Sequence, residues 1–301
     1  MYRIHINQPI DDLIQQINNV YSFNKQHSIN FLIDFQHLEF IFPYKLAVLA
    51  SWVESLRLNF EVFVDCVNIH HNTESYVSRM NFFDEIRFPY VETFYRQNEK
   101  GRFIPIRRIN EDNRYTLATD MVKIMEKQWT DVHRSVISSL NWAIHEITDN
   151  IFNHSYTQID GFAVAQYFPQ KREIEAVIID NGIGIPRRLR ENPKYASRSN
   201  QDVLKLATDH KITTDPDEGV GAGLYYTKCI IQENRGRLII YSNDAHLTYD
   251  DKGMESRLSH FWQGTIIRFV IKTNKYVDHH KIWGNNLPPT VLDYLEDGTL
   301  W

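Results

Sequence analysis

Cysteine is scarce in this chain of 301 residues, which contains only Cys66 and Cys229. The two lie far apart in the sequence, outside the spacings typical of a metal site or a disulfide framework. Both have apolar neighbours, so we expect buried thiols in a reducing compartment.

Long apolar runs are also missing, since none approaches the roughly 18 residues that a membrane-spanning helix requires. The first residues, MYRIHINQPIDDL, lack the charged and apolar segments of a signal peptide. The formal net charge is only -5, so the composition does not call for a polyanionic partner. We therefore expect a cytoplasmic protein without membrane contact, in which small basic patches such as Arg187, Arg188 and Arg190 are solvated surface rather than a nucleic-acid site.

The motif GK[ST] of a P-loop is absent, which excludes the commonest phosphate-binding loop. Hydrophobic residues make up 43% and aromatic residues 13% of the chain, enough for well-packed cores. The length suggests about two domains. The composition therefore favours a globular protein with two folded units.

Residues 1–108 alternate between strand and helix patterns. YRIHI, INFLIDF and FEVFVDC predict strands, and the stretches between them and after the last predict three helices. This alternation is typical of a small α/β unit with a parallel or mixed sheet.

The order of these segments resembles STAS domains, the fold of anti-sigma-factor antagonists and related regulatory modules. In that family a phosphorylatable serine stands at the start of the helix that follows the central strand. This sequence has Pro43 at about that place, where proline is favoured because its φ is preset for a first helical turn. The resemblance therefore implies a STAS-like module that docks a protein partner rather than a phosphorylation switch.

The stretch NWAIHEITDNIFNHS predicts a helix with polar side chains on one face and isoleucines on a neighbouring face. The polar positions, spaced i, i+3, i+4, i+7 and i+8, are Glu146, Asp149, Asn150, Asn153 and His154. Taken alone, this stripe fits a solvated helix face as well as it fits a site.

Two segments that contain glycine follow the helix. IEAVIID predicts a strand that ends at Asp180 and continues into NGIGIP, and DEGVGAGLYYTKCII opens a second amphipathic helix. RLIIYS and GTIIRFVIK then predict two strands, the second with Thr265 near its start. DNGIG alone would be an ordinary turn, so only the order of all four parts indicates a site.

In that order the four parts resemble the GHKL superfamily, the ATP-binding fold of gyrase-type ATPases, heat-shock chaperones of that class, histidine kinases and mismatch-repair ATPases. The resemblance covers roughly residues 116–273. It implies that residues 109–274 form a Bergerat-type α/β sandwich with helices on one face of a mixed, mainly antiparallel sheet. It also implies ATP and Mg²⁺ as cofactors.

The resemblance implies a role for four side chains. Asp180 would accept a hydrogen bond from the adenine amino group, and Thr265 would help to hold the base. Asn150 would ligate Mg²⁺, the only metal ligand that we expect from the chain. Glu146 would orient or deprotonate the attacking water in a hydrolysing enzyme, or handle the phosphoacceptor in a kinase.

The glycine segments complete the expected site. Gly182 and Gly184 would let the backbone pass close under the base, and GVGAGL would present N–H groups to phosphate at a helix N-terminus. The further residues expected to contact the nucleotide are Asp149, Asn153, Ile185, Gly219, Val220, Gly221, Ala222, Gly223 and Leu224.

The remaining segments receive supporting roles. Residues 90–115 predict an interdomain connection, and 186–218 a lid in which Lys211, Thr213 and Thr214 are candidate phosphate contacts. Residues 275–301 predict a docking tail that packs on either domain or on a second subunit, so the sequence allows a homodimer. His133 is expected in the helix before the polar stripe.

We therefore expect a Mg²⁺-ATP-binding regulatory protein in which Glu146-dependent hydrolysis resets a lid and a protein interface. Two alternatives stay open. One is a serine kinase of the anti-sigma type that acts on a partner, and the other is an ATP sensor without turnover.

Overall fold

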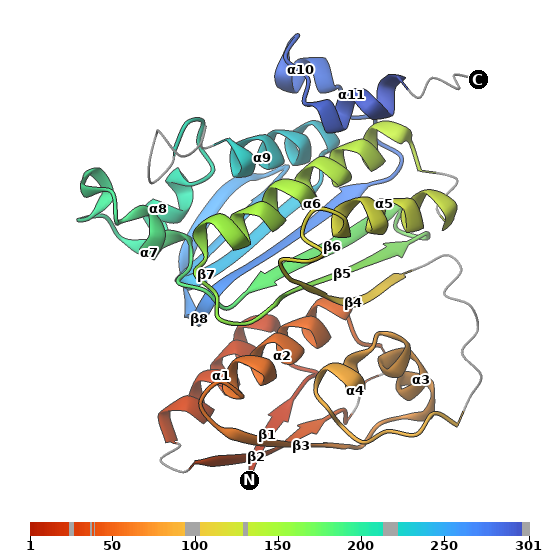
Figure 1. Cartoon of the computed structure of the whole chain (residues 1–301), viewed down its shortest axis with the longest axis vertical. Helices are drawn as coiled ribbons and strands as arrows, with labels where there is room; N and C mark the ends of the chain where they lie inside the picture. Colours follow the sequence, from red (N-terminus) through yellow and green to blue (C-terminus); the bar gives the residue numbers. More distant parts are fainter. Residues whose placement is uncertain are drawn as a thin grey trace.

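Two sheets of different type organise the chain (Figure 1). The computed structural model describes residues 1–23, 27–36, 38, 40–93, 103–128, 132–212 and 222–296. The strands of the parallel sheet, in the order β1-β2-β3, are β1 (Tyr2–His5), β2 (Ser28–Asp34) and β3 (Glu61–Val67). Those of the antiparallel sheet, in the order β4-β5-β6-β8-β7, are β4 (Phe103–Ile109), β5 (Gly161–Phe168), β6 (Glu173–Asp180), β7 (Arg237–Asp250) and β8 (Gly253–Lys272).

Most helices lie between the strands in sequence and pack on the two sheets. They are α1 (Ile10–Phe23), α2 (Pro43–Leu56), α3 (His71–Arg79), α4 (Phe82–Glu85), α5 (Leu117–Gln128), α6 (Arg134–His154), α7 (Ile185–Leu189), α8 (Asn200–Leu206), α9 (Gly223–Asn234), α10 (His279–Trp283) and α11 (Pro289–Glu296), with a 3₁₀ turn at Pro193–Tyr195. None of these described helices is long and apolar enough to cross a membrane.

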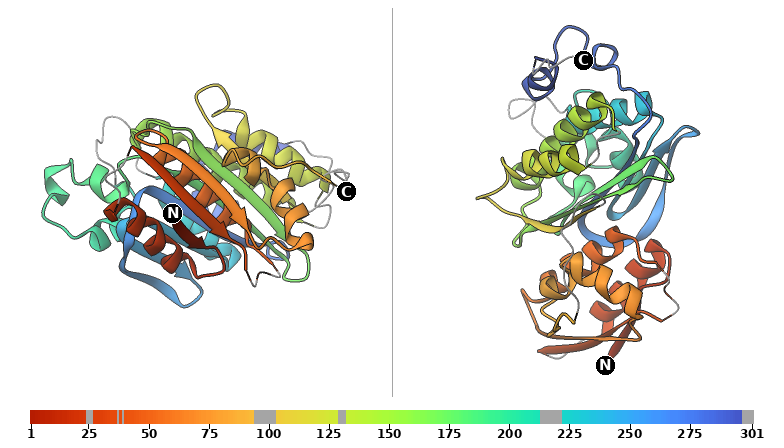
Figure 2. Two further views of the ribbon diagram at one scale, coloured as in Figure 1. Left: turned by 90° about the horizontal axis from the view of Figure 1, so that it is seen from below. Right: turned by 90° about the vertical axis from the view of Figure 1, so that its right-hand side faces the viewer.

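The N-terminal unit is a β1-α1-β2-α2-β3 arrangement with all pairings parallel, which confirms the predicted α/β alternation. Helix α2 begins at Pro43 and is buried over almost its whole circumference. A helix that is apolar on all sides must be covered on all sides. Accordingly, α2 lies between the two sheets (Figures 1 and 2).

The C-terminal sheet confirms the predicted antiparallel character and departs from the prediction in one respect. All four of its strand pairings are antiparallel, so the sheet is not mixed. Helices α5, α6 and α9 cover one face, but the second face is also covered, by α1 and α2. The physical reason lies in β5 and β6, which are apolar and buried on both faces and therefore need two covering layers.

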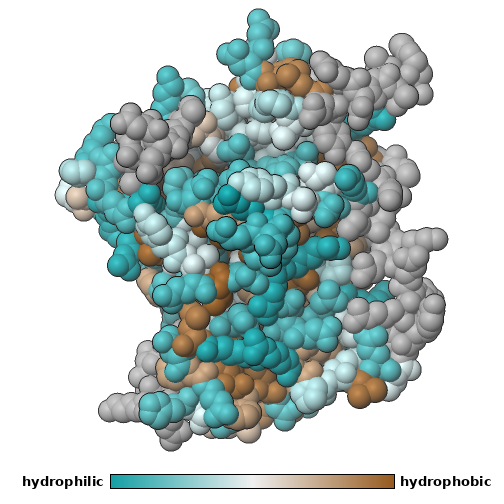
Figure 3. All heavy atoms as spheres, in the orientation of Figure 1, coloured by the Kyte–Doolittle hydropathy of each residue, from teal (hydrophilic) through white to brown (hydrophobic). Residues whose placement is uncertain are grey.

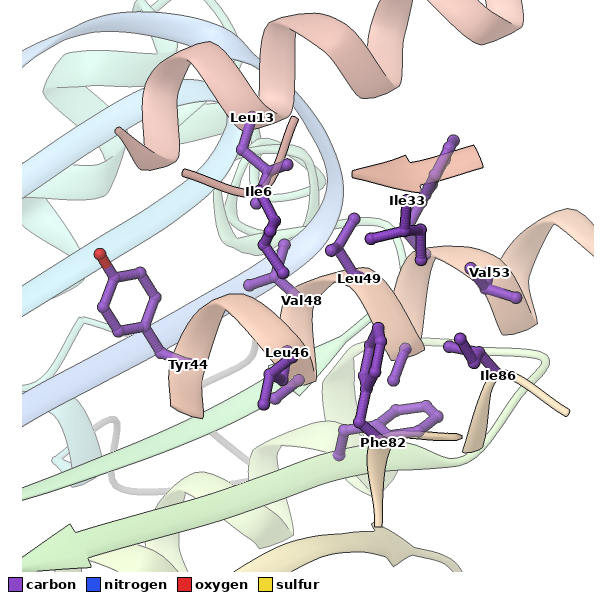
Figure 4. Close-up of a cluster of buried hydrophobic side chains, with 14 of the residues drawn as sticks. Ile6, Leu13, Ile33, Tyr44, Leu46, Val48, Leu49, Val53, Phe82 and Ile86 are labelled. Carbon is purple, nitrogen blue, oxygen red and sulfur yellow. The ribbon is translucent and has the colours of Figure 1, made fainter. Parts of the chain in front are cut away.

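One hydrophobic cluster crosses the junction between the units. Leu46, Leu49 and Val53 of α2 belong to the same buried cluster as Val164 of β5 and Val177 of β6. Figure 4 shows the part of this cluster around Leu46, Leu49 and Val53. The two units therefore share a core.

Polar contacts add to this junction. Arg257 of β8 forms an ion pair of 2.6 Å with Asp11 of α1. The Arg268 guanidinium lies 4.2 Å from the ring centroid of Tyr44 and binds Glu175 at 2.7 Å. The Arg257–Asp11 pair is partly exposed, whereas Glu175 is buried and needs its partner Arg268. Together these contacts favour one orientation of the N-terminal unit on the sheet.

Strand β4 lies in the stretch predicted as an interdomain connection. It is the edge strand of the antiparallel sheet, and its register shifts between Ile104 and Arg107. Pro105 falls within this shift, and proline in a sheet is confined to edges and bulges. The bulge breaks the alternation of side chains, which hides the strand in the sequence.

Other local predictions have mixed outcomes. Two helices over residues 115–155 are confirmed, but His133 does not lie in the first of them. It is the N-cap of α6, where its Nδ1 accepts a hydrogen bond from the Ser135 N–H at 3.0 Å. Cys66 and Cys229 are partly rather than fully buried, and burial raises the pKa of both thiols.

The surface in the orientation of Figure 1 is largely hydrophilic, with hydrophobic residues gathered mainly in its lower part, over the N-terminal unit (Figure 3). Two large apolar side chains of the N-terminal unit are exposed to solvent, Phe63 by 52% and Leu58 by 47%.

Candidate functional site

A cavity of about 540 Å³ lies between α6, the N-terminus of α9, the end of β6 and the middle of β8. Its size is typical of a site for a small molecule. The residues that line it are Trp142, Glu146, Ile147, Asp149, Asn150, Ile151, Asn153, His154, Ser155, Ile178, Asp180, Gly184, Ile185, Arg188, Leu189, Ala207, Ile212, Ala222, Gly223, Leu224, Tyr226, Thr265, Ile267, Trp283, Asn286 and Pro288.

Asp180 forms one end of the cavity. It is the last residue of β6, is 6% exposed, and pairs in register with Thr265 of β8. Burial raises the pKa of its carboxyl to about 6, although hydrogen bonds from the Gly182 N–H, at 2.8 Å, and from Thr265 favour the ionised form. A buried carboxylate of this kind is a strong acceptor for a donor on a ligand.

Thr265 is held by its own partner. The Ser242 hydroxyl lies 3.2 Å from the Thr265 hydroxyl and donates to the Gly264 carbonyl oxygen at 2.9 Å. Ser242 also accepts the Ile185 N–H at 2.9 Å. Hydrogen bonds through Ser242 thus join the middle of β7, the middle of β8 and the start of α7 next to Asp180.

The glycines after Asp180 are required by the protein rather than by a ligand alone. A Cβ on Gly182 would lie 2.0 Å from the Ser155 carbonyl oxygen, at the end of α6. Gly184 has φ of 83°, and a Cβ there would meet the Asn243 side chain at 2.6 Å. We expected these glycines to make room under a base, but the close packing of this turn on α6 and β7 is enough to require them.

The polar stripe of α6 forms the long wall of the cavity. Glu146, Asp149, Asn150, Asn153 and His154 all line it. On the neighbouring face, Ile144 is fully buried and orients the helix. The structure therefore brings the predicted stripe onto the same cavity as Asp180.

Glu146 has an unusual environment for a carboxylate. Burial, followed by the negative charge of Asp149 one turn later, raises its pKa to about 7. A Cβ on Gly223, the first residue of α9, would lie 2.8 Å from Glu146 Oε2 and 3.6 Å from Asn150 Nδ2. The α9 N-terminus thus lies close to both side chains, with room for no side chain at Gly223. A carboxyl with a pKa near neutrality is suited to exchange protons.

The cavity lining is acidic. It contains three carboxylates, Glu146, Asp149 and Asp180, and one guanidinium, that of Arg188. Arg188 lies 5.0 Å from the Tyr156 ring centroid and pairs with Glu191. Among the described residues, no cluster of three His, Cys, Asp or Glu side chains could hold a metal ion. An anionic ligand would therefore need a cation to bind beside the α6 carboxylates.

The other predicted site residues are placed as follows. Ile185, Ala222, Gly223, Leu224 and Thr265 line the cavity, whereas Gly182 and Lys211 are not part of the lining. Gly182 acts on the site through the hydrogen bond from its N–H to Asp180. Gly219, Val220 and Gly221 lie outside the described residues, as do Thr213 and Thr214.

One end of the cavity is aromatic, which was not predicted from the sequence. Trp142 of α6, Tyr226 of α9 and Trp283 of α10 meet there with ring centroids 5.3 to 5.8 Å apart. Trp142 precedes Glu146 by four residues, so the polar stripe could have been extended to it. The C-terminal segment supplies Trp283, Asn286 and Pro288. Their spacing does not indicate which helix this segment packs against.

No family model matches this sequence, and none of the curated proteins is significantly similar to it.

Proposed function

We propose that the chain is a regulatory protein that binds Mg²⁺-ATP in the cavity between α6, α9 and the antiparallel sheet. The observation that carries the proposal is the convergence of four separate parts of the sequence on one cavity. A buried carboxylate, Asp180, stands at one end, and the Glu146 and Asn150 side chains stand against a helix N-terminus further along. The carboxylate suits a base, the amide oxygen suits a magnesium ion, and the helix N-terminus suits phosphates.

In this proposal Asp180 and Thr265 would hold the adenine, because a buried acceptor beside a hydroxyl suits an exocyclic amino group. Asn150 would contribute an uncharged oxygen to Mg²⁺, which prefers few protein ligands and keeps waters. The first N–H groups of α9 would face phosphate oxygens. The metal would offset the three carboxylates of the lining and the charge of the phosphates.

Glu146 would accept the proton of the attacking water. Its pKa of about 7 leaves a substantial share ionised at neutral pH while keeping it basic enough to act. The fold also supports the proposal, since α5, α6 and α9 cover one face of an antiparallel sheet, as expected for a GHKL domain. The N-terminal unit would then be the STAS-like module, with its outer surface available to a protein partner.

The test is incubation with Mg²⁺ and ATP labelled at the γ-phosphate, for the wild type, Glu146→Gln and Asp180→Asn. We expect labelled free phosphate from the wild type and none from either variant. Asp251→Asn, which changes an exposed carboxylate in the β7–β8 turn, is the matched control and should behave as the wild type. Label on an added partner protein would instead indicate a kinase, and absence of ATP binding would reject the proposal.

A further inference from the structure

The C-terminal segment after β8 is attached to α6 by buried contacts. The Val277 N–H donates to the Ser135 hydroxyl at 3.1 Å. His279 is 3% exposed, and its Nε2 lies 3.0 Å from the Ser139 hydroxyl and 3.3 Å from that of Ser138. Burial lowers the pKa of His279, so the ring is neutral at pH 7. Hydrogen bonds to a buried ring of this kind require one arrangement of the segment.

A second attachment lies at the cavity. Trp283 is 8% exposed and packs between Trp142 of α6, at 5.3 Å, and Tyr226 of α9, at 5.4 Å. Aromatic pairs at these distances stabilise the contact beyond the area they bury. The turn that follows places Asn286 and Pro288 in the cavity lining, and Val291 of α11 is fully buried behind it.

The position of this attachment along α6 is informative. Trp142, Glu146, Asn150 and His154 are each four residues apart and all line the cavity. Four residues advance a helix by about 6 Å. The aromatic group therefore stands about 6 Å beyond Glu146, whereas the Asp180 turn contacts the other end of α6 through Ser155. A nucleotide with its base at Asp180 and its phosphates at Asn150 and Glu146 would point its terminal phosphate at Trp283 and Asn286.

We propose that residues 277–288 are a fixed wall of the nucleotide site that encloses the terminal phosphate, so that water and not another protein receives this phosphate. The inference rests on the proposed function. In the reaction, the water oxygen bonds to the γ-phosphorus while one water proton passes to Glu146. The bond from the γ-phosphorus to the β–γ bridging oxygen breaks, and its electron pair stays on ADP. In this proposal, residues 277–288 occupy the space beside the terminal phosphate that the serine side chain of a partner would need.

The wall contacts the part of the ligand that ADP lacks. We therefore expect Asn286→Ala and Trp283→Ala to weaken the binding of Mg²⁺-ATP about tenfold and that of Mg²⁺-ADP less than about twofold. Asn286 is exposed in its turn, so its variant tests the wall even where Trp283→Ala lowers stability. The affinities are measured by isothermal titration of each nucleotide.

Lys281→Ala is the matched control, because it removes the 3.0 Å ion pair between α10 and Glu233 without altering the cavity lining. It should leave both affinities unchanged. Equal losses for ATP and ADP in the Asn286 variant, or no loss, would overturn the wall while leaving the proposed function intact. Absence of both nucleotides from the wild type would overturn the two together.

The acceptor is tested separately with γ-labelled ATP and dephosphorylated casein as a protein rich in serine. The wall predicts labelled free phosphate and unlabelled casein. Transfer of label to casein at a rate comparable with phosphate release would contradict it.

Discussion

The side-chain amide of Asn181 donates hydrogen bonds to Ser51, and so joins the turn after Asp180 to helix α2 of the N-terminal unit. Asp180 lines the cavity, while the residue that follows it reaches the opposite side of the sheet. Trp262, which belongs to the core shared with α2, donates to the Asp180 carbonyl oxygen at 3.3 Å. One end of the cavity and the N-terminal unit are therefore held by the same turn.

Ser51→Ala tests this connection. Ser51 is fully buried, and loss of its hydroxyl leaves the Asn181 amide with a weaker partner at the Ser51 carbonyl oxygen, 3.5 Å away. We expect a loss of about 1–2 kcal/mol in the free energy of unfolding and a several-fold weaker affinity for ATP, because the turn that positions Asp180 loosens. Urea denaturation and ATP titration, the latter at a temperature where both proteins are folded, measure the two effects.

Ser55→Ala is the control for that experiment. Ser55 lies one turn further along α2, and its hydroxyl bonds to the Trp52 carbonyl oxygen at 2.7 Å. It should leave the ATP affinity unchanged. If Ser51→Ala also left the affinity unchanged, the N-terminal unit would have no part in positioning the site.

Asp180 makes the unliganded protein less stable as pH rises. Its folded-state pKa of about 6 exceeds the usual 3.8, so the folded state binds more protons than the unfolded state between these values. The free energy of unfolding should therefore fall from about pH 4 to pH 6, by about 3 kcal/mol for this group.

Asp180→Asn removes the buried carboxyl whose ionisation lowers the stability. We expect the variant to be more stable than the wild type at pH 7, by up to about 3 kcal/mol, and to have lost ATP binding. Chemical denaturation at pH 4, 6 and 7 measures the difference, with Asp251→Asn as the exposed control. If the difference in stability between the variant and the wild type were the same at pH 7 as at pH 4, the ionised Asp180 carboxylate would not destabilise the folded protein.

The raised pKa of Glu146 leads to a prediction about how turnover depends on pH. Because its pKa is about 7, hydrolysis should rise with pH through that value as the carboxylate forms. Burial is the larger cause and the charge of Asp149 the second. Asp149→Asn should therefore move the midpoint of the pH–rate profile to lower pH without returning it to that of an exposed glutamate. An unchanged midpoint would show that ionisation of Glu146 does not control the rate of hydrolysis.

Gly182 and Gly223 should respond differently to alanine. The Cβ of Gly182→Ala would lie 2.0 Å from backbone at Ser155, and backbone cannot yield without moving the end of α6. We expect a loss of several kcal/mol in the free energy of unfolding. In Gly223→Ala the obstacle is the Glu146 carboxylate at 2.8 Å, a side chain that can rotate.

Gly223→Ala should therefore fold with little loss of stability but lower turnover by displacing Glu146. Thermal unfolding together with phosphate release distinguishes the two variants. Equal stability of both would contradict the close docking of the Asp180 turn.

Much of the site could be predicted because its residues lie in strongly periodic segments. The polar stripe of α6 and the strand that ends at Asp180 follow from spacing alone, whereas Thr265 was expected only from the resemblance to the GHKL superfamily. Three features could not be predicted, because they depend on contacts between distant segments. Apolar α2 gave no indication of which sheet it covers, Pro105 obscured β4, and Trp283 gave no sign of its place beside Trp142. The role of Gly182 required the position of Ser155, which only the fold supplies.

Isothermal titration of ATP into the wild type and Asp180→Asn, each with Mg²⁺ and with excess EDTA, tests the nucleotide site itself. We expect one binding site per chain in the wild type with Mg²⁺. Binding should weaken strongly in EDTA, because the α6 carboxylates Glu146 and Asp149 then lie beside the phosphates without a cation, and it should disappear in Asp180→Asn. Binding of equal strength in Asp180→Asn, or none in the wild type with Mg²⁺, would contradict a nucleotide site in this cavity.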